Sequence, residues 1–104
     1  MVIVIAEVDV VPRLLDEAFA LSRAHVARSR AEPGCLSHAV LVDPDRPTHL
    51  VFVEEWATEA ALQDHFAVPA TQQFVDALAV LAAARPSVRL YRAQAMPLPG
   101  PRAA

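Results

Sequence analysis

Two apolar runs joined by a short turn constrain this chain more than any other feature of it. Residues 35–42 (CLSHAVLV) and 49–56 (HLVFVEEW) are rich in the β-branched and aromatic side chains that strands favour. Between them, Asp43-Pro44-Asp45-Arg46-Pro47 contains too many turn formers to continue either run. The two runs are therefore predicted to form an antiparallel hairpin that the rest of the chain must cover.

The segment before the hairpin predicts a strand followed by a helix. Residues 2–10 are apolar on both sides in their first half, which is typical of a central strand or of one that meets a second sheet. Pro12 suits the first turn of a helix, and the chain up to about Ala31 carries an apolar stripe that includes His25. Glu32-Pro33-Gly34 is expected to end this helix and to turn the chain into the hairpin.

A short helix is predicted directly after the hairpin. Thr58 is suited to cap its N-terminus, because its side-chain oxygen can accept a backbone hydrogen bond. Leu62 and Phe66 lie one helical turn apart and are expected to point inward together. Val68-Pro69 interrupts this helix, because proline disfavours a helical residue before it.

A second helix and a last strand complete the predicted secondary structure. The helix follows Pro69, buries Phe74 and is expected to end at Arg85-Pro86. Residues 87–96 alternate as a strand does. The order β-α-β-β-α-α-β is that of a ferredoxin-like, split βαβ fold of the α+β class, with a four-stranded antiparallel sheet.

The predicted fold occupies one domain, residues 1–96, because 104 residues suit a single core. Residues 97–104 contain too much proline and glycine for regular structure and are expected to form a loose tail. Helices cover only one face of such a sheet, whereas valine and leucine occur on both faces. We therefore expect a homodimer in which the two sheet faces pack together.

Charge and composition limit the partners of the chain. The formal net charge of −3 is spread along the sequence, without a basic cluster that could neutralise several phosphates, so we expect no nucleic-acid partner. The sequence contains no leader and no run of roughly 20 apolar residues, so we expect no membrane association. The single Cys35 cannot form an internal disulfide. These features predict a cytoplasmic protein.

Several motifs together resemble one known family. They are Glu32-Pro33-Gly34-Cys35-Leu36, Phe52-Val53-Glu54-Glu55-Trp56, Glu59-Ala60-Ala61-Leu62, His65 and the segment from Pro69 to Phe74. This set resembles the antibiotic biosynthesis monooxygenase (ABM) domain of the dimeric α/β-barrel superfamily. Its members include cofactor-free oxygenases of aromatic polyketide anthrones, quinol monooxygenases, haem-degrading enzymes and a signal-molecule isomerase.

The resemblance implies a particular kind of chemistry. Cofactor-free members need a dry apolar pocket, polar groups that favour deprotonation of a phenol or anthrone, and room for O2 beside the resulting anion. The substrate anion supplies the electrons, so no cofactor is expected. The haem-degrading branch carries an Asn, a Trp and an axial His at positions that fall near Val8, on His65 and near Val75. None of the three matches, which disfavours haem.

Two histidines are the candidate catalytic residues, because histidine titrates near neutral pH. His65 follows Leu62 on the predicted helix, at the border of its buried side. A pocket role for His65 competes with that of a solvent-edge or helix-packing residue. His38 stands in an apolar strand, where the alternative is a buried histidine that hydrogen-bonds a carboxylate.

The register of the hairpin decides what surrounds His38. If the first and last residues of the turn 43–47 pair, His38 lies opposite Phe52 and shares its face with Glu54 and Trp56. These three residues are then the best polar and aromatic group in the chain. The residues expected to bind substrate are Trp56, Glu54, Phe66, Phe74 and His25, although a core role is the alternative for Trp56 and His25.

Four histidines also raise the question of a metal site. No two of them have close ligand spacing, and no HxH or HxxE motif occurs. His49 is expected on the sheet face opposite His38, and Cys35 is expected to be a packing residue. We therefore expect no metal.

The leading hypothesis is a cofactor-independent monooxygenase that oxidises a small aromatic, phenolic or quinol-type substrate with O2. His65 or His38 would accept the proton, and aromatic side chains would form the walls. One alternative is a non-oxidative small-molecule-binding or isomerase-type member of the same superfamily. Another is a dimerisation module without catalysis, in which the apolar surplus serves only the interface.

Overall fold

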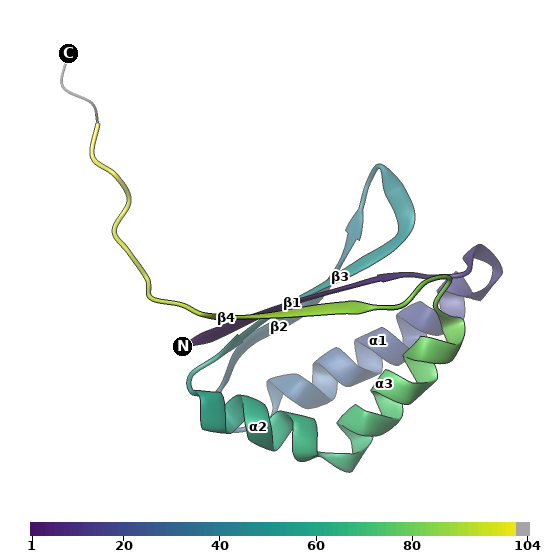
Figure 1. The fold of residues 1–104 in the computed structure, drawn as a ribbon, viewed down its shortest axis with the longest axis horizontal. Coiled ribbons are helices and arrows are strands. Elements are labelled where there is room, and N and C mark those ends of the chain that lie inside the picture. Colours follow the sequence, from purple (N-terminus) through teal and green to yellow (C-terminus); the bar gives the residue numbers. More distant parts are fainter. Residues whose placement is uncertain (102–104) are drawn as a thin grey trace.

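A four-stranded antiparallel sheet with helices on one face forms the framework of the molecule (Figure 1). The structure is a computed structural model, and it describes residues 1–101. The strands are β1 (Val2–Asp9), β2 (Cys35–Asp43), β3 (Arg46–Trp56) and β4 (Ser87–Arg92), in the spatial order β2-β3-β1-β4. The helices are a 3-10 turn (Pro12–Leu14), α1 (Leu15–Arg30), α2 (Glu59–Ala67) and α3 (Pro69–Leu81). The predicted ferredoxin-like α+β fold is confirmed.

The side chains that face the helices form the core. Alternate residues along β1 and β3 are buried, among them Val4, Val8, Leu50 and Phe52, because successive strand side chains point to opposite faces. Trp56, at the end of β3, is fully buried. The predicted central position of the first strand is confirmed, since β1 pairs with both β3 and β4.

The β2–β3 turn is shorter than predicted, and an irregularity in the ladder beside it changes the register. Asp43 pairs with Arg46, and the ladder is irregular next to Asp43. His38 therefore lies opposite Glu54, whereas the sequence predicted Phe52. The predicted register was wrong by two residues, and an even displacement leaves every side chain on its predicted face.

The last helix ends earlier than predicted. It was expected to reach Arg85-Pro86, but α3 stops at Leu81. The residues that follow pair with the end of β1 instead. Ala83 donates its backbone N–H to the carbonyl of Asp9 at 2.7 Å, and Ala82 forms an isolated antiparallel bridge with Val10. Tertiary pairing therefore ends a helix that composition alone would have continued.

The last strand is also shorter than predicted. It ends at Arg92 instead of residue 96, because within residues 1–101 its only neighbouring strand is β1 and their ladder ends at the Val2–Arg92 pair. Residues 93–101 contain no helix or strand. Residues 102–104 of the predicted tail lie outside the described residues, so the division into a domain and a tail stays a prediction. None of the helices in residues 1–101 is long and apolar enough to cross a membrane.

One face of the sheet, opposite the helices, is left uncovered (Figure 1), and its centre is apolar. Ile5, Val51 and Val53 lie there, each partly buried, and Leu41 and Tyr91 are 53% and 45% exposed. No helix of the described residues covers this face, which leaves apolar surface available to a partner.

His49 lies at one end of the same uncovered face, as predicted. Its Nε2 is 2.9 Å from Glu7 Oε1, and its Nδ1 is 2.6 Å from Asp9 Oδ1. Hydrogen bonds to these two carboxylates raise the pKa of His49 above its usual value. Both ring nitrogens of His49 are thus paired with carboxylates on the sheet face away from the helices.

Gly34 fixes how α2 meets the start of the hairpin. Its φ of 82° lies in the left-handed region that favours glycine, and its carbonyl accepts a 2.8 Å hydrogen bond from the N–H of Ala57. A Cβ at this position would lie 2.5 Å from the Cβ of Ala61 in α2. Backbone conformation and close approach therefore both require glycine here.

Replacing Gly34 by alanine should lower the free energy of unfolding by roughly 2 kcal/mol or more, because it combines an unfavourable φ with a steric contact. Urea unfolding of Gly34→Ala against the parent chain measures this. Gly100→Ala is the control, because a Cβ at Gly100 meets nothing within 4 Å. Equal stability of the two variants would show that the turn does not constrain α2.

Candidate functional site

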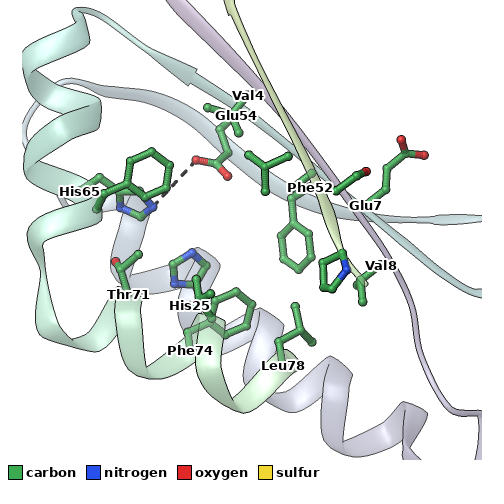
Figure 2. Close-up of a pocket in the computed structure, with 16 residues that line it drawn as sticks. Val4, Glu7, Val8, His25, Phe52, Glu54, His65, Thr71, Phe74 and Leu78 are labelled. Carbon is green, nitrogen blue, oxygen red and sulfur yellow. Dashed lines mark ion pairs between the residues drawn. The ribbon is translucent and has the colours of Figure 1, made fainter. Parts of the chain in front are cut away.

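A small apolar pocket lies between the inner face of the sheet and the helices (Figure 2). Its volume is about 100 Å³. Its apolar walls include Val4, Val8, Phe52, Phe74, Leu78 and Val88. Engineered apolar cavities of roughly 150 Å³ hold benzene, so this pocket suits a single ring or a smaller molecule.

Few polar groups reach the pocket, and most of them are on one side. In Figure 2, Glu54 extends from the sheet toward His65, and His25 lies beside Phe74. The His25 ring stacks on Phe74 with centroids 4.0 Å apart and an interplanar angle of 4°. The pocket is thus an apolar space with one polar wall of titratable side chains.

Three histidines from three different elements meet beside this polar wall; His25 and His65 line the pocket, whereas His38 contacts their rings without lining it. His25 comes from α1, His38 from β2 and His65 from α2, and all three are buried. Their ring centroids are 5.2 Å apart for His25 and His38, 5.3 Å for His25 and His65, and 5.8 Å for His38 and His65. The fold therefore collects side chains that are widely separated in the sequence.

One oxygen of Glu54 lies at the centre of these contacts. Its Oε1 accepts a 2.9 Å hydrogen bond from the indole N–H of Trp56. The Nε2 atoms of His38 and His65 lie 3.3 Å and 3.9 Å from the same oxygen. The His38 contact is within ion-pair range but is not in hydrogen-bond geometry, so both ring nitrogens of His38 lack a hydrogen-bond partner within residues 1–101.

His65 is held from its other side by a second carboxylate. Its Nδ1 lies 2.9 Å from Oε1 of Glu32, in the turn that ends α1. An ionised carboxylate can only accept, so Nδ1 donates this hydrogen bond, and in the neutral ring Nε2 then carries a free lone pair. The indole of Trp56 packs against the imidazole of His65 with centroids 4.5 Å apart. The ring of His65 is therefore fixed in orientation and in tautomer.

Burial and nearby charge set the protonation states at this wall. Burial, followed by the charges of His38 and His65, lowers the pKa of His25 to about 3, so this imidazole is neutral near pH 7. Burial raises the pKa of Glu54, but its contacts with His38, Trp56 and His65 outweigh burial and hold the pKa below its usual value. The site thus combines a neutral imidazole with an ionised, buried carboxylate.

Phe66 is not placed as predicted. It was expected to point inward with Leu62, but its side chain is 45% exposed, whereas Leu62 is buried. Its ring borders both the pocket and a second, more open hollow of about 370 Å³, which Tyr91 and Arg92 also line. Phe66 therefore lies on the wall between two spaces, because α2 sits at the end of the sheet with one side open to solvent.

The structure brings together most of the residues that the sequence singled out, but the predicted site residues His38 and Trp56 do not line the pocket. His38, Glu54 and Trp56 share one face, and His65, His25 and Phe74 join them from the helices. Sequence reasoning missed Glu32 as a site residue and read it only as part of a helix stop. Its place in the Glu32-Pro33-Gly34 motif was the one available signal, and its contact with His65 depends on the packing of α2.

His25 should make the protein less stable in acid. Between its ordinary pKa of 6.5 and its folded pKa of about 3, the unfolded chain binds a proton that the folded chain excludes. The free energy of unfolding therefore falls as pH falls, by roughly 1 kcal/mol per pH unit. Urea unfolding at pH 7 and pH 5 should show a weaker pH dependence for His25→Gln.

The matched control for this measurement is His49→Gln. The pKa of His49 is raised, so its contribution is complete below the unfolded pKa and is lost as pH rises through the folded pKa. The His49→Gln variant should therefore lose stability more steeply than the parent chain as pH falls, whereas His25→Gln should lose it less steeply. An unchanged pH dependence in His25→Gln would contradict a neutral, buried His25.

Comparison with known proteins agrees with the fold and the motifs. Residues 1–77 match the sequence model of the family described as antibiotic biosynthesis monooxygenase. An uncharacterised protein of Synechocystis is 32% identical over 91 residues, which are 88% of this chain and 62% of that protein. The chain therefore spans somewhat less than two thirds of the length of this relative.

Two solved structures are similar over nearly the whole chain. A crystal structure of an antibiotic biosynthesis monooxygenase superposes with a TM-score of 0.84 at 34% identity, covering 91% of this chain and all of that one. A Deinococcus radiodurans protein, provisionally assigned as an antibiotic biosynthesis monooxygenase, gives a TM-score of 0.89 at 28% identity, covering 96% of this chain and 100% of its own. Sequence motifs, sheet order and these matches agree that the chain belongs to the antibiotic biosynthesis monooxygenase family.

Proposed function

We propose that this chain is a monooxygenase that oxidises a small, single-ring quinol or phenol with O2, without a cofactor that takes part in the chemistry. The observation that carries the proposal is His65, whose Nδ1 is anchored by Glu32 while the ring borders the apolar pocket. The pocket volume of about 100 Å³ favours a single ring over a fused three-ring anthrone. Family membership supports a monooxygenase-like or small-molecule-binding role in general.

The first step is removal of a phenolic proton by Nε2 of His65. The imidazolium that forms is stabilised by Glu32 at 2.9 Å from Nδ1 and by Glu54 at 3.9 Å from Nε2. An apolar pocket strengthens both interactions, because little water is present to screen them. Phe52 and Phe74 supply aromatic walls against which a substrate ring can pack.

The oxidation is balanced without an external reductant. A quinol that reacts with one O2 gives a hydroxyquinone and one water, so one oxygen atom forms the new C–O bond and the other leaves as water. The substrate supplies all four electrons that O2 takes up. The protein only has to generate the anion, hold it beside O2 and return protons to the leaving oxygen.

A non-oxidative reaction is the second candidate. His65 and Glu54 lie close together on one wall of the pocket, which suits removal of a proton from one atom and its return to another. Such an isomerisation would use the same residues and would not need O2. The dimerisation-module alternative is disfavoured by the polar wall, because an interface module does not require buried titratable groups beside a cavity.

Oxygen uptake with a panel of hydroquinones, measured in the presence of a chelator, tests the proposal. His65→Gln should lower kcat by at least about 10²-fold, because it removes the proton acceptor. Glu32→Gln should lower it less, because it loses only the anchor of the ring. His49→Gln is the matched control, since His49 lies on the other face of the sheet, and it should retain full activity.

Each outcome of the assay has a distinct meaning. Uptake that is insensitive to His65→Gln would remove His65 from the mechanism. Conversion of the substrate at the same rate without O2 would contradict the monooxygenase proposal and support isomerisation. A lack of turnover and of any substrate-induced rise in Tm would overturn the assignment of the pocket.

We also propose that the chain forms a homodimer through its uncovered sheet face, which would give a dimeric α/β barrel. The apolar centre of this face, with Ile5 and Val53, supports that arrangement. Sedimentation velocity should give a dimer for the parent chain and a monomer for Val53→Arg. Val80→Arg on α3 is the control, because Val80 is 79% exposed on the helical side, and it should remain dimeric. A dimer that persists in Val53→Arg would place the interface elsewhere.

A further inference from the structure

The three buried histidines beside the pocket form a ready set of metal ligands. One ring nitrogen from each of His25, His38 and His65 lies within 4.8 Å of the other two. These residues are only 4%, 1% and 2% exposed. Imidazole nitrogen is a preferred ligand of Zn²⁺, Co²⁺ and related ions of the first transition row. Histidines on a surface can cluster by chance, but burying three imidazoles in contact removes their polar nitrogens from water and so requires a compensating interaction.

His38 supplies the strongest reason to expect such an interaction. Both of its ring nitrogens are buried without a hydrogen-bond partner among residues 1–101. A buried polar group without a partner costs roughly 1–3 kcal/mol, so such groups are rare in folded proteins. A metal ion at the centre of the three rings would satisfy one of these nitrogens directly. Glu54 Oε1 lies 3.3 Å from Nε2 of His38 but outside hydrogen-bond geometry, so a ring nitrogen of His38 remains available to a ligand.

The surroundings of the three histidines resemble the outer shell of a metal site. Glu32 accepts a hydrogen bond from Nδ1 of His65 and leaves Nε2 free, which is the carboxylate–histidine arrangement that orients metal ligands. Glu54 Oε1 lies within 3.9 Å of Nε2 of both His38 and His65 and is held in place by Trp56. A carboxylate oxygen is therefore placed to act as a fourth ligand and to balance charge.

The ligand atoms must move closer together to bind an ion. Nitrogens bonded to tetrahedral Zn²⁺ at about 2.0–2.1 Å are roughly 3.4 Å apart, which is shorter than the 4.8 Å limit of the present cluster. Each ring comes from a different element, so the approach of up to about 1.4 Å is expected from rotations about the side-chain bonds.

We propose that His25, His38 and His65 bind one divalent metal ion of the Zn²⁺ or Co²⁺ type, with Glu54 as the fourth ligand. Spacing in the sequence argued against a metal, because the ligands lie on three elements that only the fold brings together. The inference goes beyond the proposed function and does not depend on it. A bound ion would occupy Nε2 of His65, so metal binding should suppress any reaction in which that atom accepts a proton.

Titration of the metal-free chain with Co²⁺ tests the site without substrate or O2. The parent chain should bind one Co²⁺ per chain and develop the visible absorption of four-coordinate cobalt, which Zn²⁺ should then displace. His38→Ala should weaken binding at least about 100-fold, because it removes a ligand. Glu32→Gln should weaken it about 10- to 100-fold, as expected when the partner of a ligand is lost.

Two comparisons keep the test decisive. His49→Gln removes the histidine that pairs with Glu7 and Asp9 on the opposite sheet face and should leave Co²⁺ binding unchanged. Excess Zn²⁺ should raise the Tm of the parent chain and of His49→Gln but not of His38→Ala or His25→Phe. Circular dichroism of each variant shows whether it is folded, and His25→Phe preserves the packing against Phe74 if His38→Ala unfolds.

The assignment is overturned by any of three results. These are the absence of both cobalt absorption and a Zn²⁺-induced rise in Tm, binding that persists in the folded His38 and His25 variants, and binding that is lost in His49→Gln. The last result would place the ion at His49, Glu7 and Asp9. None of these outcomes bears on oxygen uptake measured with a chelator, so failure of the metal site and failure of the proposed oxidation are distinguishable.

Discussion

The buried carboxylate of Glu54 is the constraint on which the arrangement of the site depends. An ion taken out of water costs several kcal/mol unless it is paired and hydrogen-bonded, so the surrounding elements must supply partners. Trp56 donates to one of its oxygens, and imidazoles of His38 and His65 approach the same oxygen from β2 and α2. The hairpin register and the position of α2 are thus tied to one side chain of the central sheet.

The link between α2 and the rest of the site runs through the turn before the hairpin. Glu32 anchors His65, and two residues later Gly34 lets α2 approach so closely that a Cβ would collide with Ala61. A single short turn therefore ends α1, starts β2 and positions the histidine on α2. This explains physically why a motif of glutamate, proline and glycine at this place has consequences for a pocket formed mainly by other elements.

The two faces of the sheet differ in the number of carboxylates that they place beside their histidines. On the uncovered face, His49 is matched by Glu7 and Asp9 and its pKa is raised. On the helical face, three histidines share the two carboxylates of Glu32 and Glu54, and burial drives the pKa of His25 down to about 3. An excess of buried imidazole over carboxylate leaves ring nitrogens free, which is what proton transfer and metal binding both require.

The sequence by itself determined the class of fold, the order of its elements and the sheet face on which each hairpin residue lies. It could do so because strand alternation, proline and glycine act over a few residues. Only the tertiary structure decided that α3 ends at Leu81, that His38 lies opposite Glu54, and that Glu32 reaches His65. These features depend on contacts between segments far apart in the chain, for which local pattern carries no information. The same reason explains why ligand spacing in the sequence gave no sign of three histidines that meet only after folding.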